Sequence, residues 1–193
     1  MYEATFEFRY LDTAISITLK QSELLEDEAG GFFTSGHADA ARLMRMKDDY
    51  DGAEPSGNSV SLMNLLRLHR ITGRADFEAS ARRLIATFQS RVSAMPTGMP
   101  QMLAAAEFDL AALREIVVAG ERSSKMLHLL WEKFDPNRIL LYADEHAAAF
   151  NPAIAAMPSR AGETTVYVCE NFACQQPVSR AEDLAGLLSG TTG

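Results

Sequence analysis

Cysteine, basic residues and long hydrophobic runs are all scarce in this 193-residue chain. Two cysteines, Cys169 and Cys174, are too few for the disulfide framework of a secreted protein, so we expect reduced thiols and a cytoplasmic location. No apolar run approaches the roughly 18 residues of a membrane span, and no signal-peptide pattern opens the sequence. The 18 Lys and Arg against 26 Asp and Glu give a net charge of −8, which disfavours nucleic acids and membranes as partners.

The composition is otherwise that of a folded globular protein. Hydrophobic residues make up 47% of the chain and charged residues 23%, a balance that argues against long disordered or fibrous segments. The length suffices for one large domain, or for a medium domain with a small appendage. We therefore expect the chain to bury a substantial core.

Two segments in the first half carry the apolar period of an α-helix. Residues 77–92 place their apolar side chains in one stripe, which predicts a helix with a single buried face. Residues 59–71 are apolar around most of the circumference, so we expect that helix to be buried on more than one side. The segment 55–59 offers capping hydroxyls, and Gly73 stands where a helix-ending glycine is favoured. The two helices should therefore form an antiparallel hairpin.

A weaker copy of this pattern lies upstream. Residues 10–17 repeat the apolar spacing of residues 77–84, and the helix is expected to continue to about Leu25. Such repetition favours a two-layered α/α ring, although a plain helical repeat gives the same pattern. Taken alone, the strict alternation of apolar residues between positions 2 and 10 indicates a strand.

The second half changes to strand-like patterns. Three segments predict a strand, a helix and a second strand in the order of a βαβ unit: residues 115–120, 123–134 and 138–142. A third strand is expected at 164–169, and a capping box beginning at Ser179 predicts a last helix that ends near Leu188.

These patterns predict a mostly α-helical chain with a small α/β module. Residues 1–112 are expected to form helical hairpins, and residues 113–193 the α/β module with its βαβ unit. Near residues 30–47, two short strand-like runs on either side of a turn predict a β-hairpin inserted between the helices.

The densest group of polar side chains, at residues 47–59, immediately precedes the most buried helix. It combines four carboxylates, a phenol, an amide and two hydroxyls at a helix end, where backbone N–H groups are free to meet a ligand. Two carboxylates held at a suitable separation can act as acid and base on a glycosidic bond. Alternatively, the carboxylates are solvated loop charges while the hydroxyls and the amide cap the helix.

Under the first interpretation this segment binds a sugar-like ligand. Asp51 is then the candidate catalytic residue, and the candidate ligand-binding residues are Lys47, Tyr50, Ser56, Asn58 and Ser59. The pattern predicts no metal site and no cofactor, because it contains no ligand set of zinc spacing and no phosphate-binding glycine motif.

Several motifs in the chain are similar to those of one family. They stand at residues 50–59, 65–68, 72–73, 30–33, 100–103, 117–120 and 167–175. Together they resemble the YyaL-like family, which includes spermatogenesis-associated thioredoxin-like proteins. The resemblance implies an N-terminal thioredoxin-like domain followed by a six-hairpin α/α toroid related to glycosidases and N-acylglucosamine 2-epimerases. This chain resembles only the C-terminal part, so we expect a fragment carrying an incomplete toroid.

The resemblance also implies functional properties. The intact protein would be a glycosidase-like or sugar-epimerase-like enzyme acting on a carbohydrate-like molecule, and the fragment alone would be inactive. Alternatively, the region is a non-catalytic scaffold for the thioredoxin-like domain. The resemblance marks Cys169 and Cys174 as candidate redox residues, although they lack the two-residue spacing of a thioredoxin motif.

An incomplete toroid has two structural consequences. Residues 1–6 become the end of a helix rather than a strand. The inner helix faces around Phe6, Val60, Met63 and Leu66 lose their partners, so we expect self-association through them.

Overall fold

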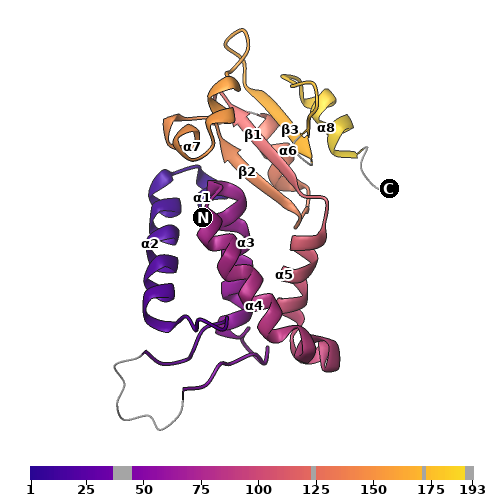
Figure 1. Cartoon of the computed structure of the whole chain (residues 1–193). Coiled ribbons are helices and arrows are strands. Elements are labelled where there is room, and N and C mark those ends of the chain that lie inside the picture. The colour runs from indigo at the N-terminus through magenta and orange to yellow at the C-terminus, as the bar shows by residue number, and fades with distance from the viewer. Residues whose placement is uncertain (37–44, 123–124, 171–172, 190–193) are drawn as a thin grey trace. The chain divides into compact units, whose positions relative to one another are not determined.

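The computed structural model describes residues 1–36, 45–122, 125–170 and 173–189. They divide into two units, drawn in Figure 1. A helical unit comprises residues 9–111, and an α/β unit comprises residues 1–8 together with residues 112–193. Among the described residues, no helix is both long and apolar enough to cross a membrane.

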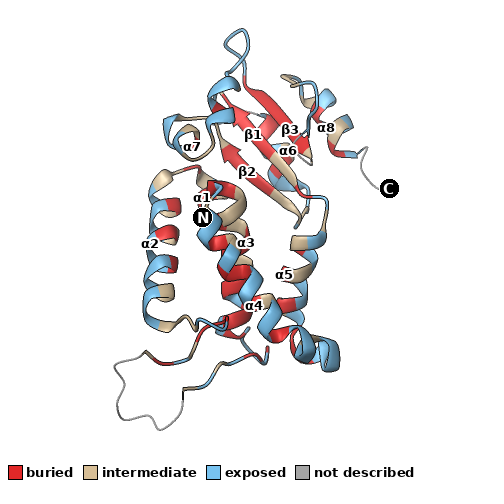
Figure 2. Cartoon of the chain, viewed as in Figure 1, coloured by how far each residue is buried: buried red, intermediate tan, exposed pale blue. Residues whose placement is uncertain are grey.

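The helical unit is built around α3. Its elements are α2 (Phe8–Leu25, which begins one residue before the unit), α3 (Gly57–Thr72), α4 (Ala75–Ala94), the 3-10 helix η1 (Pro96–Gly98) and α5 (Pro100–Leu110). Helix α3 packs against both α4 and α5, and it is buried over much of its length (Figure 2). Helix α4 buries the single stripe that contains Phe77, Leu84 and Phe88. Both burial patterns confirm the expectations from periodicity.

The ends of α3 also follow from the sequence. Ser56 is the N-cap, and its hydroxyl oxygen accepts a hydrogen bond from the Ser59 N–H at 3.1 Å. Gly73 ends the helix in the left-handed conformation, with φ of 68°, and its N–H donates to the His69 carbonyl at 2.7 Å. A glycine adopts this conformation without steric cost, so the α3–α4 hairpin forms as predicted.

The β-hairpin expected near residues 30–47 is not formed in the part of that segment the structure describes. Phe32 forms an isolated bridge with Glu26 rather than with residues 45–47, and a backbone hydrogen bond, from the Thr34 N–H to the Met46 carbonyl, joins residues 30–36 to residues 45–47. Gly30 has a φ of +107°, which interrupts an extended strand. The rest of the predicted hairpin, residues 37–44, lies outside the described residues.

The α/β unit contains a four-stranded mixed sheet. Its elements are α1 (Tyr2–Thr5), β1 (Arg114–Ala119), α6 (Lys125–Glu132), β2 (Arg138–Tyr142), α7 (Glu145–Phe150), η2 (Pro152–Ala156), β3 (Thr165–Glu170), β4 (Ala173–Cys174) and α8 (Ala181–Ser189). The strand order is β2-β1-β3-β4, with β1 parallel to β2 and β3 antiparallel to both β1 and β4. The parallel β1–α6–β2 connection confirms the predicted βαβ unit.

One face of this sheet carries the core of the unit. Alternate side chains of β1 and β3, among them Ile116, Val118 and Val166, pack with Leu127 of α6 and Leu184 of α8. Figure 2 shows the central strands buried, as expected for a sheet covered by helices.

Residues 1–8 belong to the α/β unit and not, as expected from the sequence, to the helical part. Residues 2–5 are helical, in agreement with the helix-end interpretation rather than the strand. Phe6 is only 1% exposed, and its ring packs against Tyr142 at a centroid distance of 5.5 Å. Phe6 therefore does not lie on an open inner face, which corrects that expectation.

The other residues of the expected open face differ among themselves. Leu66 is also buried, because α3 is covered by α4 and α5, whereas Val60 is 40% exposed. Self-association was expected through this face, but only part of the face is exposed to solvent. Self-association itself stays a prediction.

Candidate functional site

The polar cluster is a loop that leads into α3. We define it as Lys47, Asp48, Asp49, Tyr50, Asp51, Glu54, Ser56, Asn58 and Ser59. The structure separates these residues into two groups: Asp49, Asp51, Ser56, Asn58 and Ser59 are buried, while Asp48, Tyr50 and Glu54 are exposed. Lys47 lies between these extremes.

The Asp51 carboxylate connects two helix N-termini. Its Oδ1 accepts a hydrogen bond from the Ser56 N–H, at the start of α3, at 2.8 Å. Its Oδ2 accepts from the Gln101 N–H at 2.8 Å and from the Met102 N–H at 3.3 Å, both in the first turn of α5. A negative charge at this end of a helix is favourable, because the first N–H groups have no partner within the helix. Asp51 thus caps α5 from a distant part of the chain.

These hydrogen bonds determine the ionisation of Asp51. Burial alone would raise the pKa of this carboxyl group, but the hydrogen bonds from Ser56, Ser59, Gln101 and Met102 outweigh burial and lower the pKa below 3.8. Asp51 is therefore an ionised carboxylate at neutral pH. A general acid needs the opposite, a pKa raised toward the working pH.

The lowered pKa of Asp51 predicts an acid-sensitive contribution to stability. A carboxylate whose pKa is lower in the folded state stabilises that state fully above the pKa of the unfolded chain, near 4, and this contribution is lost as the pH falls through the folded-state pKa. The wild-type chain should therefore lose more stability between about pH 5 and about pH 3 than the Asp51→Asn variant. Urea unfolding across this range measures the difference, and equal pH slopes would contradict it.

Asn58 ties the start of α3 to the glycine-containing loop at residues 30–33. Its side-chain oxygen accepts a hydrogen bond from the Phe32 N–H at 2.7 Å. Its amide nitrogen donates to the Phe32 carbonyl at 3.0 Å and to the Asp48 carbonyl at 2.7 Å. Gly31 has a φ of +77°, and a Cβ placed there would lie 3.2 Å from the Asn58 oxygen, so both the backbone conformation and the close approach of this loop favour glycine. Both ends of the Asn58 amide are engaged within the protein.

Charged members of the cluster also have internal partners. The Lys47 ammonium group lies 2.8 Å from the Asp27 carboxylate and donates to the Gly30 carbonyl at 2.5 Å. The Asp49 carboxylate lies 2.6 Å from the Arg91 Nε of α4. These ion pairs hold the loop against neighbouring segments instead of presenting charge to a ligand.

Tyr50 differs from the buried members of the cluster. It is 57% exposed, although it stands between Asp49 and Asp51, which are both buried. Its ring lies close to two glycines, since a Cβ placed on Gly52 or Gly98 would come within 3.2 or 3.4 Å of it. Tyr50 is therefore an exposed aromatic ring that lies against two glycines.

The site could not be assembled from the segment 47–59 alone. The residues that meet it, Gln101 and Met102 of α5 and Phe32 of the loop, lie 26 to 51 positions away in sequence. Two of the motifs on which the family resemblance rested, residues 30–33 and 100–103, contain these partners. The family resemblance therefore indicated the segments that contact the polar cluster, whereas the spacing of residues within the cluster did not.

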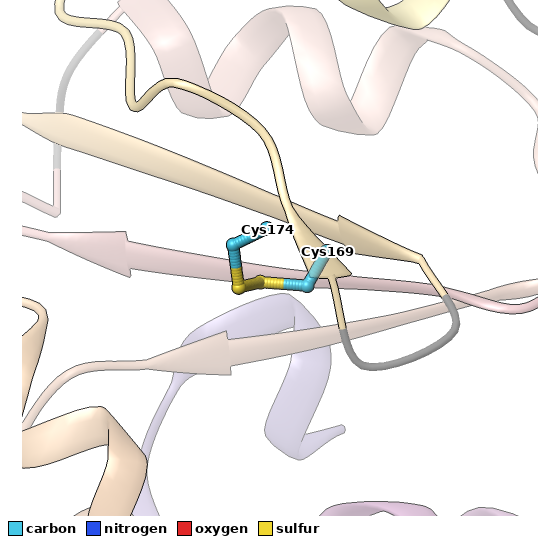
Figure 3. The surroundings of a disulfide bond; sticks show 2 residues. All are labelled: Cys169 and Cys174. Carbon is cyan, nitrogen blue, oxygen red and sulfur yellow. A yellow bond between two sulfur atoms is a disulfide. The ribbon is translucent and has the colours of Figure 1, made fainter.

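The two cysteines are bonded to each other, which corrects the expectation of reduced thiols. Cys169 of β3 and Cys174 of β4 form a disulfide, shown in Figure 3. They are five positions apart, yet they are direct neighbours because β3 and β4 pair in antiparallel register. The spacing of the two cysteines did not reveal the pair, since it is the pairing of β3 with β4 that brings them together. Among the residues that the structure describes, no group of three His, Cys, Asp or Glu side chains could hold a metal ion.

Comparison with known proteins gives relatives over nearly the whole chain. Spermatogenesis-associated protein 20 of Homo sapiens and that of Mus musculus are each 34% identical to it over 198 aligned residues, which cover 97% of this chain and 25% of each relative. An uncharacterised protein of Caenorhabditis elegans is 27% identical, covering 98% of this chain and 26% of the relative. No family model matches the chain. The chain therefore spans about a quarter of the length of the curated relatives it matches.

Proposed function

Because the chain belongs to the family of spermatogenesis-associated protein 20 and spans about a quarter of the length of those proteins, we propose that it acts as a non-catalytic structural region of a larger protein. One observation carries this proposal: the Asp51 carboxylate accepts three hydrogen bonds from backbone N–H groups of α3 and α5. In this role the polar cluster joins α3, α5 and the loop at residues 30–33.

The chemistry of the cluster supports a structural role. A general base must direct a free lone pair at a substrate proton, and a general acid must hold a proton at neutral pH. Asp51 is ionised, and both of its oxygens are directed at N–H groups. Asn58 uses its oxygen and its nitrogen for the protein backbone. A sugar hydroxyl would have to replace these internal hydrogen bonds, which costs free energy unless it reproduces them.

In the larger protein, α3 and α4 would form one hairpin of a six-hairpin toroid. Such a ring needs each hairpin to be held at a fixed position relative to its neighbours. The Asp51 and Asn58 contacts fix the N-terminal end of α3 against two other segments, which is the property that a supporting hairpin requires. The thioredoxin-like domain expected from the resemblance would be the partner that this scaffold serves.

A second candidate function is the binding of a carbohydrate-like molecule. The observation that favours it is the exposed ring of Tyr50, which lies beside the exposed residues Asp48 and Gly52. An aromatic face next to polar groups is a surface on which the apolar face of a sugar ring can rest. In that case Tyr50, rather than Asp51, would make the principal ligand contact.

Thermal unfolding in the presence of sugars distinguishes the two functions. We expect glucose, mannose and N-acetylglucosamine at millimolar concentration to leave the unfolding midpoint of the chain unchanged, because the structural role offers no sugar site. The same titration on a full-length relative extends the test to the intact protein.

Tyr50→Ala is the matched variant for this experiment. Because Tyr50 is exposed, its removal should change stability by less than about 0.5 kcal/mol. A saturable rise of the midpoint with one sugar that Tyr50→Ala abolishes would overturn the structural proposal in favour of carbohydrate binding.

A further inference from the structure

The disulfide lies at an edge of the sheet in the α/β unit. The polar cluster belongs to the helical unit, so the two features are separate. We propose that Cys169–Cys174 is a reversible thiol–disulfide exchange site, which fastens strand β4 to β3 when oxidised and releases it when reduced. This inference does not depend on the proposed structural role of the polar cluster.

Strand β3 is held firmly without the disulfide. All six of its residues, Thr165–Glu170, pair with β1, and five of them are buried. Reduction should therefore leave β3 in the sheet, because its pairing with β1 does not involve β4.

Strand β4 has much weaker support. It consists of Ala173 and Cys174, both exposed, and it pairs only with the end of β3. Beyond it, the Gln175 N–H donates to the Val168 carbonyl at 2.9 Å, and Val178 exchanges two backbone hydrogen bonds with Val166. No side chain of β4 is buried, so the disulfide is the strongest link that holds residues 173–175 to β3.

The two sulfur-bearing residues differ in their accessibility. Cys174 is exposed, whereas Cys169 is only 7% exposed. A thiolate attacks the sulfur that it can reach in line with the S–S bond, so Cys174 is the residue on which a mixed disulfide forms and Cys169 is the leaving thiolate. The adjacent Glu170 carboxylate lies 2.8 Å from the Arg114 Nε, and this ion pair reduces its repulsion of an incoming thiolate.

The exchange is balanced with a dithiol as the reductant. One thiolate of the dithiol bonds to the Cys174 sulfur while the Cys169–Cys174 bond breaks, and Cys169 then takes up a proton. The second thiol of the dithiol loses its proton, displaces Cys174 and closes the disulfide of the reductant, and the released Cys174 thiolate takes up a proton. Two electrons have passed from the dithiol to the protein, which now carries two thiols.

Mass spectrometry and hydrogen exchange test the proposal on the intact chain. The chain is treated either with dithiothreitol or with a protein dithiol of the thioredoxin type, and free thiols are then alkylated with iodoacetamide. We expect two alkyl groups per chain after reduction and none before it. Peptides covering residues 173–175 should exchange about tenfold faster after reduction, while those of β1 keep their rate.

The Cys169→Ser, Cys174→Ser double variant is the control. It should show the fast exchange of residues 173–175 without reductant, and no response to dithiol. If the variant does not fold, the oxidised and reduced wild-type chains still provide the comparison. A pair that stays oxidised in dithiothreitol, or reduction that leaves the exchange of residues 173–175 unchanged, would overturn the proposal. Reduction by dithiothreitol but not by the protein dithiol would restrict the exchange to small dithiols.

Discussion

Replacing Asp51 with alanine should lower the free energy of unfolding of the helical unit by about 3 kcal/mol. The substitution removes a buried carboxylate and leaves the N–H groups of Ser56, Gln101 and Met102 without their acceptor. Hydrogen bonds to charged groups contribute more than neutral ones, and unpaired buried donors add a desolvation cost. Urea unfolding followed by circular dichroism, which reports mainly on the helices, measures the effect.

Glu54→Ala is the matched control for the Asp51 variant. Glu54 belongs to the same loop and carries the same charge, but it is exposed. Its replacement should change the free energy of unfolding by less than about 0.5 kcal/mol. Equal effects of the two substitutions would show that the loss of a loop charge, rather than of the helix connection, explains the destabilisation.

Replacing Phe6 with alanine should destabilise the α/β unit by about 3 to 5 kcal/mol. Phe6 is 1% exposed and packs with side chains of the sheet and of α6, so its removal leaves a cavity in the core. The chain has one tryptophan, Trp131, which lies in α6 and whose ring is 6.4 Å from that of Phe6. Its fluorescence therefore follows the unfolding of this unit.

Phe134→Ala provides the control for the Phe6 substitution. Phe134 is a phenylalanine of the same unit, but it is 89% exposed. Its loss should leave the Trp131 transition within about 0.5 kcal/mol of the wild type. If Phe6→Ala were equally harmless, residues 1–8 would not be part of the core of the α/β unit.

Local patterns were sufficient to predict helices α2, α3, α4, α6 and α8 and the succession of β1, β2 and β3 along the chain, but not α5, α7 or the order of the strands in the sheet. The apolar stripe of residues 77–92 and the glycine at position 73 are short-range signals, and the structure contains the helices they predict. The βαβ unit could also be predicted from the sequence, because buried parallel strands are continuous apolar runs such as Ile139–Leu141.

Contacts between residues far apart in the sequence could not be predicted from these local patterns. The sequence near Asp51 fits a loop with capping residues as well as it fits a ligand site. Only the position of α5 decides which hydrogen bonds the carboxylate makes. Phe6 shows the same limit, since its partners Trp131 and Tyr142 are more than 120 residues away in sequence. The disulfide depended on a strand register that spacing alone does not reveal.

Amide hydrogen exchange at Gln101 and Met102 tests most directly whether Asp51 holds α5. These N–H groups are in the first turn of the helix, where no partner within the helix is available, and Asp51 is their acceptor. We expect both amides to be protected in the wild-type chain and to exchange at least about tenfold faster in Asp51→Ala, while amides of β1, in the α/β unit, keep their rates. Unchanged protection of Gln101 and Met102 in the variant would contradict the structural role assigned to Asp51.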